Sequence, residues 1–157
     1  MTTTTAPATV TAPAATTNGR AIALAHYSAR ALLERVLTSH GITFEQSVTL
    51  RAVVAAGESI GFEALVGDVT GSLKADAPVV RGVIEELITA KLLQEDPAQA
   101  SPVRLTDAGR ELYERTSAES AEISARLYAD IPEEDLAVAG RVLALLTERA
   151  NAALAGV

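Results

Sequence analysis

Residues 62–109 decide the fold, and they read FEALVGDVTGSLKADAPVVRGVIEELITAKLLQEDPAQASPVRLTDAG. Apolar side chains recur at helical spacing over residues 62–73 and again over 77–90, with a turn between the two segments. Short apolar runs follow at residues 92–95 and 102–105, and an Asp-Pro pair that favours a turn lies between them. Two helices joined by a turn and followed by a small hairpin are the layout of a winged helix, which places one helix in a DNA major groove.

The second helix of this pair is the candidate for reading bases. Asp76 suits its N-cap and Pro78 suits its first turn. The apolar inner face consists of Val80, Val83, Ile84, Leu87 and Ile88, and the outer face offers Val79, Arg81, Gly82 and Glu86. Arg81 is the best candidate for bidentate contact with guanine. The alternative is that Arg81 is a solvated residue paired with Glu85, four positions further along the helix.

The other candidate DNA contacts flank Arg81 on the helix or lie on the wing. They are Lys74, Asp76, Ala77, Pro78, Val79, Gly82, Gln99, Ser101 and Arg104. Lys74 and Arg104 would contact phosphates, which supply most of the non-specific affinity for DNA, although both could be ordinary surface cations. Since basic and acidic side chains balance over residues 74–91, we expect modest attraction to phosphates, with recognition concentrated around Arg81.

The rest of the chain supports one domain that is mainly α-helical, with about six helices and a small β-hairpin wing. Residues 1–19 are rich in Thr, Ala and Pro and carry no charged side chain, which predicts a disordered tail. Residues 20–157 form the domain, with a winged-helix lobe at about 42–110. The segments 20–40 and 110–154 are predicted as dimerisation helices, because their apolar surface exceeds what a lobe of this size can cover.

Two apolar sets carry this prediction for the terminal helices. In the first helix they are Ile22, Ala25, Ala29, Leu32, Leu33, Val36 and Leu37. In the last helix, which opens at Pro132, the predicted inner side is Leu136, Ala139, Leu143, Leu146 and Leu154. A two-fold protein matches a palindromic DNA site, so a homodimer is the expected assembly.

Composition restricts the classes of function. The chain of 157 residues has no Cys and only two His, so disulfides and thiolate metal sites are excluded and a zinc site is disfavoured. No Gly-rich phosphate loop or Ser–His–Asp set is present, and we expect neither an enzyme nor a cofactor. No apolar run is long enough to span a bilayer and no signal peptide is recognisable, which predicts a cytoplasmic protein. The net charge of −7 weighs against DNA binding, but residues 106–157 carry −5 of it.

Three segments resemble the MarR family of bacterial transcription regulators. TFEQSVTLRAVV (43–54) resembles its second helix, and VVRGVIEELITAKLLQEDP (79–97) resembles its recognition helix running into the wing. VRLTDAGREL (103–112) carries the LT-x-x-G motif of the family, here Leu105, Thr106 and Gly109. The resemblance implies homodimeric binding to double-stranded DNA, repression, and release by a small phenolic or lipophilic effector.

The sequence also departs from the family pattern. The wing tip of the family usually carries Asp-x-Arg, whereas DPAQASP here is shorter and has Gln99 near the position of the Arg. Lys74 replaces the usual Gly between the two helices, and Gly82 replaces a polar or basic residue. An alternative function is therefore a winged-helix protein that has lost strong DNA binding and acts as a ligand- or protein-binding module.

The resemblance places an effector pocket between the DNA-binding lobe and the dimerisation helices. His26, Tyr27 and Arg30 of the first helix and Arg51 of the second could line such a pocket. Arg or His beside Tyr would suit a phenolate or carboxylate in an otherwise apolar pocket. The alternative is that His26 and Tyr27 pack at a dimer interface.

Overall fold

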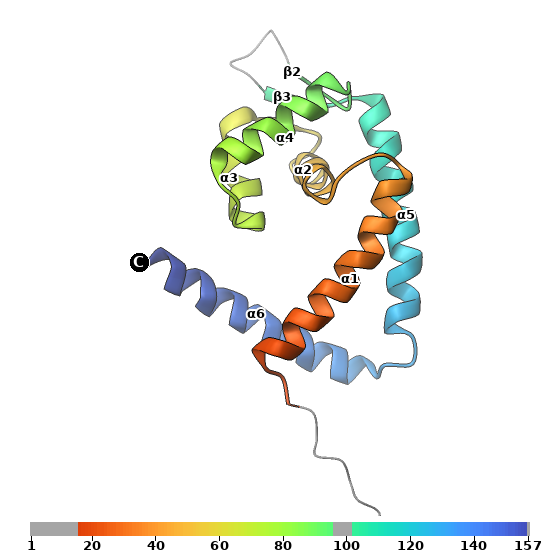
Figure 1. Cartoon of the computed structure of the whole chain (residues 1–157), viewed down its shortest axis with the longest axis vertical. Helices are drawn as coiled ribbons and strands as arrows, with labels where there is room; N and C mark the ends of the chain where they lie inside the picture. The colour runs from red at the N-terminus through yellow and green to blue at the C-terminus, as the bar shows by residue number, and fades with distance from the viewer. Residues whose placement is uncertain (1–15, 96–101, 157) are drawn as a thin grey trace, which may run out of the picture.

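The computed structural model describes residues 16–95 and 102–156. The predicted class, mainly α with a small wing, is confirmed (Figure 1). The helices are α1 (Gly19–Ser39), α2 (Phe44–Ala55), α3 (Phe62–Leu73), α4 (Ala77–Thr89), α5 (Asp107–Tyr128) and α6 (Glu133–Ala155). The strands are β1 (Ser59–Gly61), β2 (Leu93–Glu95) and β3 (Pro102–Leu105).

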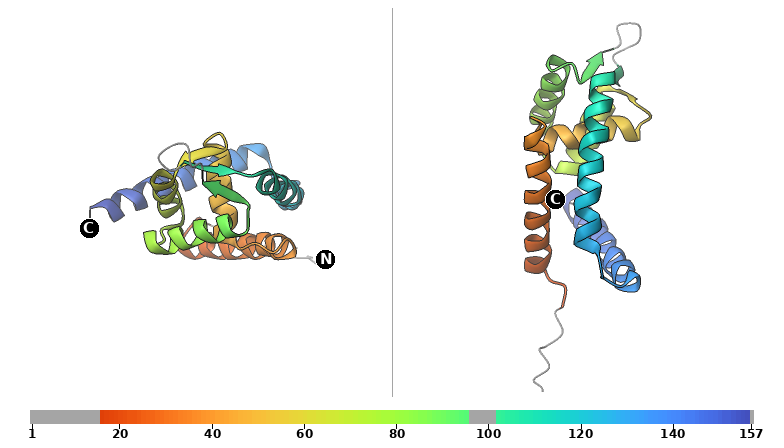
Figure 2. Two further views of the ribbon diagram at one scale, coloured as in Figure 1. Left: turned by 90° about the horizontal axis from the view of Figure 1, so that it is seen from above. Right: turned by 90° about the vertical axis from the view of Figure 1, so that its right-hand side faces the viewer.

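The elements form one compact lobe and a set of long helices. Helices α2, α3 and α4 pack on one another and on the sheet. Helices α1 and α5 lie side by side and antiparallel, and both extend from this lobe: α1 leads into it and α5 leads out of it (Figure 2). Helix α6 then turns back across the far end of α1 (Figure 1). The predicted tail reached residue 19, whereas α1 begins at Gly19; Asn18 is its N-cap and accepts a hydrogen bond from the Ala21 amide at 3.0 Å. Residues 1–15 of that tail lie outside the described part of the chain.

The core lies in the lobe and is built from aliphatic side chains. Its buried members are Leu37, Ile42, Leu50, Val53, Leu65, Val66, Val69, Val80, Ile84, Leu87, Leu93, Val103 and Leu105. The apolar stripes predicted for residues 62–73 and 77–90 both face this core, with Leu65 and Ile84 fully buried. Burial of these two stripes fixes which face of α4 remains outside.

The sheet has three strands rather than the two of the predicted hairpin. Its order is β1-β3-β2, and both neighbouring pairs are antiparallel. The third strand is Ser59–Gly61, which pairs with β3 and places Ile60 opposite Val103. Strand β1 therefore ties the start of α3 to the wing.

The junction between the sheet and α5 explains the LT-x-x-G motif. The hydroxyl of Thr106 donates to the carbonyl oxygens of Lys91 and Leu92, at 2.8 and 3.0 Å, and accepts from the Gly109 amide at 3.0 Å. A Cβ on Gly109 would lie 2.1 Å from the Leu92 carbonyl oxygen, so no side chain fits there. The motif thus joins the end of α4, the sheet and α5 at one point.

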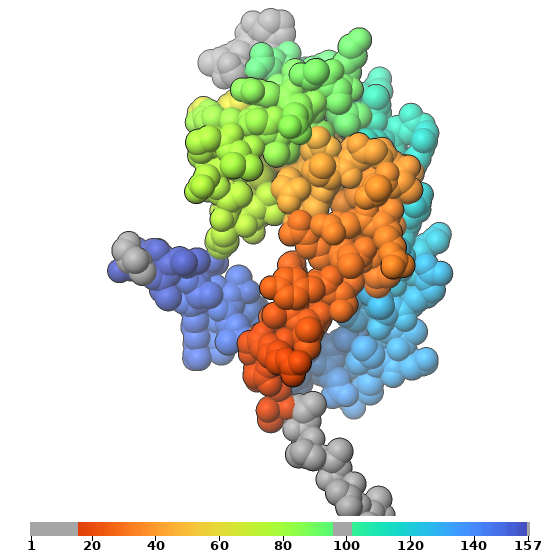
Figure 3. Space-filling view, in the orientation of Figure 1, coloured from red at the N-terminus to blue at the C-terminus, as the bar shows by residue number. Residues whose placement is uncertain are grey.

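Helix α6 leaves its apolar residues exposed. None of its described residues is buried: Leu143 and Leu146, on the side predicted to face inward, are 45% and 40% exposed within the single chain. Figure 3 shows α6 extending as an arm, with open space between its C-terminal half and the lobe. Within the single chain, the large apolar side chains of this arm remain exposed to solvent.

Candidate nucleic-acid interface

The outer face of α4 is the exposed side of the helix-turn-helix formed by α3 and α4. Val79 is 56% exposed, whereas its neighbour Val80 is buried, so the inner and outer faces divide as the sequence predicts. Ala77 and Pro78 begin the helix, and a Cβ at Gly82 would meet open space. Small side chains at these positions leave the backbone of α4 open to a close partner.

Arg81 projects from this face and is held by α3. Its Nη1 and Nη2 each donate to one carboxylate oxygen of Glu63, and both distances are 2.7 Å. Its guanidinium also lies over the Phe62 ring, 5.6 Å from the centroid. The hydrogen-bonded carboxylate belongs to Glu63 rather than to Glu85 of the predicted alternative, although the charge of Glu85 also attracts Arg81.

The pair changes the titration of both groups. Hydrogen bonding from Arg81 lowers the pKa of the Glu63 carboxyl, and the same bond raises the pKa of Arg81. Both groups therefore stay charged at neutral pH. No sequence pattern could identify this contact, since the two residues lie 18 positions apart on different helices.

The turn between α3 and α4 contains Lys74 and Asp76. Lys74 is exposed and its backbone is left-handed, with φ 54° and ψ 34°. Glycine adopts this conformation most easily, and this explains why the family resemblance predicts a glycine at this position. Asp76 occupies the predicted N-cap position of α4, but its side chain makes no capping hydrogen bond. Its carboxylate is thus not committed to the helix end.

The wing brings Arg104 to the middle strand of the sheet. Arg104 is exposed on β3, with Ser59 of β1 and Gln94 of β2 as its register partners. Gln99 and Ser101, the other predicted wing contacts, lie outside the described residues, as does the tip that carries them.

Acidic side chains share the outer face of α4 with Arg81. Glu85 and Glu86 are both exposed, and Glu86 accepts a hydrogen bond from the Gln46 amide of α2 at 3.0 Å. Gln46 also completes the capping box of α2 with Thr43, as the sequence predicts. The face is therefore mixed in charge rather than basic.

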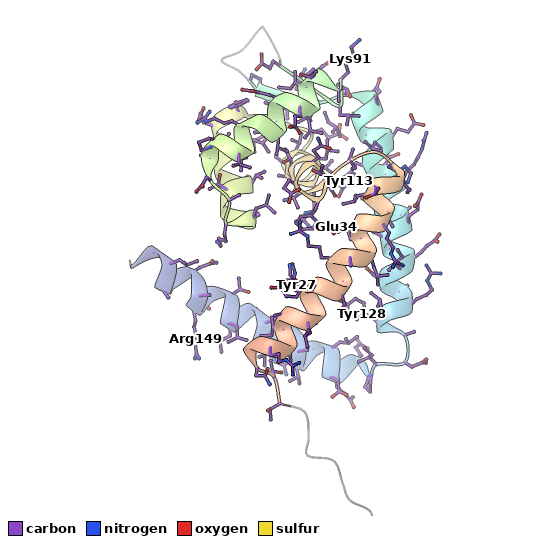
Figure 4. All side chains as sticks on the ribbon, in the orientation of Figure 1. Tyr27, Glu34, Lys91, Tyr113, Tyr128 and Arg149 are labelled. Carbon is purple, nitrogen blue, oxygen red and sulfur yellow. The ribbon has the colours of Figure 1, made fainter. Side chains whose placement is uncertain are left out.

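The predicted effector residues line several cavities, and His26 lines two of them. A cavity of about 290 Å³ between α1, α2 and α5 is lined by His26, Ala29, Arg30, Leu33, Phe44, Ser120, Ile123, Ser124, Leu127 and Tyr128. Arg51 instead lines a separate cavity of about 440 Å³ between α2 and α3, together with Asp68 and Ser72. Tyr27 is 65% exposed and projects from the side of α1 turned away from α5 (Figure 4).

Arg30 is already engaged within the first of these cavities. Its Nε donates to Glu34 at 2.7 Å and its Nη2 donates to Glu45 at 3.3 Å. Its guanidinium lies 4.2 Å from the centroid of the Phe44 ring. These contacts, the hydrogen bond to Glu34 foremost, raise the pKa of Arg30. An anionic ligand would have to share this cation with two carboxylates.

Two other kinds of feature are absent from the described residues. Among them, no group of three or more His, Asp or Glu side chains is placed to hold a metal ion. No helix of residues 16–95 or 102–156 is long and apolar enough to cross a membrane.

Comparison with known proteins identifies the fold. No family model and no curated protein matches the sequence. A MarR family transcriptional regulator from Rhodococcus sp. RHA1 superposes with a TM-score of 0.69 at 17% identity, covering 82% of this chain and 92% of that one. The chain has the MarR-family fold.

Two further structures with the MarR fold carry information on binding. Staphylococcus aureus MepR, solved in complex with DNA, has a TM-score of 0.67 and 20% identity and covers 84% of this chain and 96% of its own. Bordetella bronchiseptica BpsR, whose DNA binding is regulated by 6-hydroxynicotinic acid, has a TM-score of 0.66 and 26% identity. That match covers 82% of this chain and 91% of BpsR.

Proposed function

We propose that this protein is a DNA-binding transcriptional regulator of the cytoplasm: a homodimeric repressor that binds a palindromic operator and is released by a small ligand. The observation that carries the proposal is the exposed outer face of α4, with Arg81 at its centre, in a fold shared with MepR, which was solved on DNA. Arg81 would contact a base, and Lys74 and Arg104 would contact phosphates.

The proposed homodimer rests on the terminal helices. Large apolar side chains remain exposed on α1, α5, α6 and the link between α5 and α6, including Tyr27, Leu127, Tyr128, Ile131, Val138, Leu145 and Leu154. An apolar surface of this extent usually marks an interface. A two-fold axis would present two copies of α4 to DNA about one helical turn apart, as a palindromic operator requires.

The proposed effector site is the cavity between α1, α2 and α5. Its walls are mostly apolar, and His26 and Arg30 supply polar groups at one side. A small aromatic acid or phenol fits this composition, since its ring would face Leu33 and Phe44 while its oxygen meets His26. Arg51 and Tyr27 are proposed to act elsewhere, because neither lines this cavity.

The test is a binding titration with the DNA upstream of the gene that encodes this chain. We expect sequence-dependent binding at about 100 mM salt that weakens as salt rises. Arg81→Ala should weaken binding by about 1–3 kcal/mol and relax the preference at one base pair. Arg104→Ala should weaken binding to all sequences alike. Arg115→Ala, on α5, is the matched control and should bind as the wild type does.

A second candidate function is a ligand- or protein-binding module without strong affinity for DNA. It is favoured by the carboxylate of Glu63 on Arg81 and by the net charge of −7. Under this reading, Arg81→Ala and Arg104→Ala both leave promoter binding and repression in cells unchanged. Loss of repression with either variant excludes the module.

A further inference from the structure

The ion pair between Glu63 and Arg81 joins the two helices of the helix-turn-helix at the surface assigned to DNA. Its side chains remain well exposed, at 74% for Glu63 and 41% for Arg81. Exposed ion pairs contribute little to folding, because water screens them and side-chain entropy opposes them. The bidentate pair therefore affects mainly how Arg81 binds a ligand, and contributes little to the stability of the fold.

The geometry leaves Arg81 able to bind a base. A guanidinium has five N–H donors, and Glu63 uses one on each terminal nitrogen. Glu63 does not use the Nε–H or the remaining hydrogens of the two terminal nitrogens. The edge of the guanidinium formed by Nε and one terminal nitrogen can therefore still donate two hydrogen bonds. Guanine O6 and N7 accept such a pair in the major groove. Since Glu63 and the Phe62 ring fix the guanidinium, less side-chain freedom is lost when that contact forms.

The same carboxylate cancels the charge of Arg81. A lone arginine on this face would be attracted to phosphates of any sequence, and that attraction is the basis of non-specific binding. Beside Glu63, the pair has no net charge at neutral pH and gains little from phosphates alone. Its contribution then depends on hydrogen bonds that only the correct base can complete.

We propose that Glu63 is a positioning residue that makes Arg81 a reader of bases rather than a contact for phosphates, and so raises sequence discrimination. This inference rests on the proposed function, because it requires that the outer face of α4 meets DNA. Glu63 itself need not touch a base; it acts through the orientation and charge of Arg81.

The test compares wild type with Glu63→Gln on two kinds of probe. Each protein would select from random duplexes about 20 base pairs long, a length that holds two half-sites. Affinity for the enriched sequence and for unselected DNA is then measured over a range of salt. Asp68→Asn is the control, since it removes one negative charge from the same helix at a residue that lines the cavity beside α2.

Freeing the charge of Arg81 should change the two affinities differently. We expect Glu63→Gln to bind unselected DNA roughly three- to tenfold more tightly, with a salt dependence steeper by about one phosphate contact per subunit. The ratio of specific to non-specific affinity should fall by roughly tenfold. Asp68→Asn should leave that ratio unchanged, and thermal unfolding should be similar for all three proteins.

A double variant separates action through Arg81 from direct repulsion of DNA. In an Arg81→Ala background, Glu63→Gln should have no further effect on discrimination. An equal effect in that background, or an unchanged ratio in the single variant, overturns the role of Glu63 while leaving DNA binding intact. If wild type enriches no sequence and shows no salt-sensitive binding, the proposed function fails and this inference fails with it.

Discussion

Gly109 is the residue at which the backbone leaves no room for a side chain. The Leu92 carbonyl oxygen occupies the place where a Cβ would project, and the Leu105 side chain lies 3.0 Å from the same point. Because the nearest atom belongs to the backbone, it cannot move aside as a flexible side chain would.

Gly109→Ala should therefore destabilise the protein. We expect a loss of about 1–3 kcal/mol in the free energy of unfolding, since α5 must shift away from the end of α4. Urea unfolding followed by circular dichroism measures it. Gly67→Ala is the control: a Cβ there meets nothing within 4 Å, and the better helix propensity should keep or raise stability. Equal stability of the two variants would contradict the close approach.

Glu58 is a second residue with a structural role that the sequence hides. It is left-handed, with φ 68°, and its carbonyl accepts from the Leu105 amide at 3.0 Å. Its carboxylate accepts from Nε and Nη2 of Arg110, at 2.8 and 2.6 Å. Hydrogen bonding from Arg110 lowers the pKa of Glu58 below its ordinary value of 4.5.

Removing this carboxylate should change how stability depends on pH. Because the pKa of Glu58 is lower when folded than when unfolded, its stabilisation is present above about pH 4.5 and is lost as pH falls through the folded value. Glu58→Gln should thus lower the Tm at pH 7, and the difference from wild type should shrink below pH 4.5. Glu111→Gln, which removes the pairing of an exposed carboxylate with Arg115 within α5, should alter the Tm little at either pH.

At the scale of elements, the turn between α3 and α4 combines an unfavourable conformation with a candidate function. Lys74 adopts left-handed angles that suit glycine, and its ammonium is exposed beside the start of α4. The exposed ammonium of Lys74 at this turn fits a role in binding phosphate.

Lys74→Gly should accordingly separate stability from binding. We expect unfolding to need about 0.5–1 kcal/mol more, because the strain is relieved, while affinity for DNA falls and its salt dependence becomes shallower. Chemical denaturation and salt titration measure the two effects. Lys74→Ala, which keeps the strain, should lose affinity without gaining stability. A lower stability for Lys74→Gly would show that the turn is not strained.

Helices were predictable from the sequence because their signals are local. Apolar periodicity placed α3 at its observed bounds, and Thr43 and Thr106, residues of a type that suits an N-cap, directly precede α2 and α5. Strand β1 was missed because three residues ending in glycine give no alternation, and only pairing with β3 makes them a strand. Helix α6 was predicted as an element with apolar surface in excess of what the lobe can cover, but its direction away from the lobe depends on the turn after α5, which helical periodicity does not reveal.

The candidate site was predictable only in part. The position of Arg81 on the outer face follows from helical periodicity, but its carboxylate partner comes from the preceding helix and depends on how the two helices cross. Likewise, His26 and Arg30 line one cavity, whereas Arg51 lines a different one, because α2 packs against α3. Contacts between elements carry this information, and spacing along one helix does not.

At the scale of the whole molecule, the exposed apolar arm predicts the behaviour of the proposed dimer. Leu146→Glu on α6 should convert the protein from a dimer to a single chain at micromolar concentration, because a charge would be buried in the interface. Light scattering after size-exclusion chromatography gives the mass. Thr89→Glu, at the exposed end of α4 on the lobe, is the control and should stay dimeric. A dimer that persists with Leu146→Glu would place the interface elsewhere.

The contacts of Thr106 and Gly109 fix the start of α5, so this helix would move as a rigid body about that pivot. With 22 residues, α5 extends about 33 Å from that pivot to Tyr128, and Ser120 lies about 20 Å from the pivot; both residues line the proposed effector cavity. A tilt of α5 by about 10° about the pivot would displace its far end by roughly 6 Å. Because Thr106 and Gly109 hold the start of α5 against the sheet and the end of α4, such a tilt would also move α4 and the wing. The two copies of α4 in the proposed dimer must stay about 34 Å apart to enter successive major grooves, and they would then no longer fit. The ligand would have this effect without contacting any atom of the DNA-binding surface.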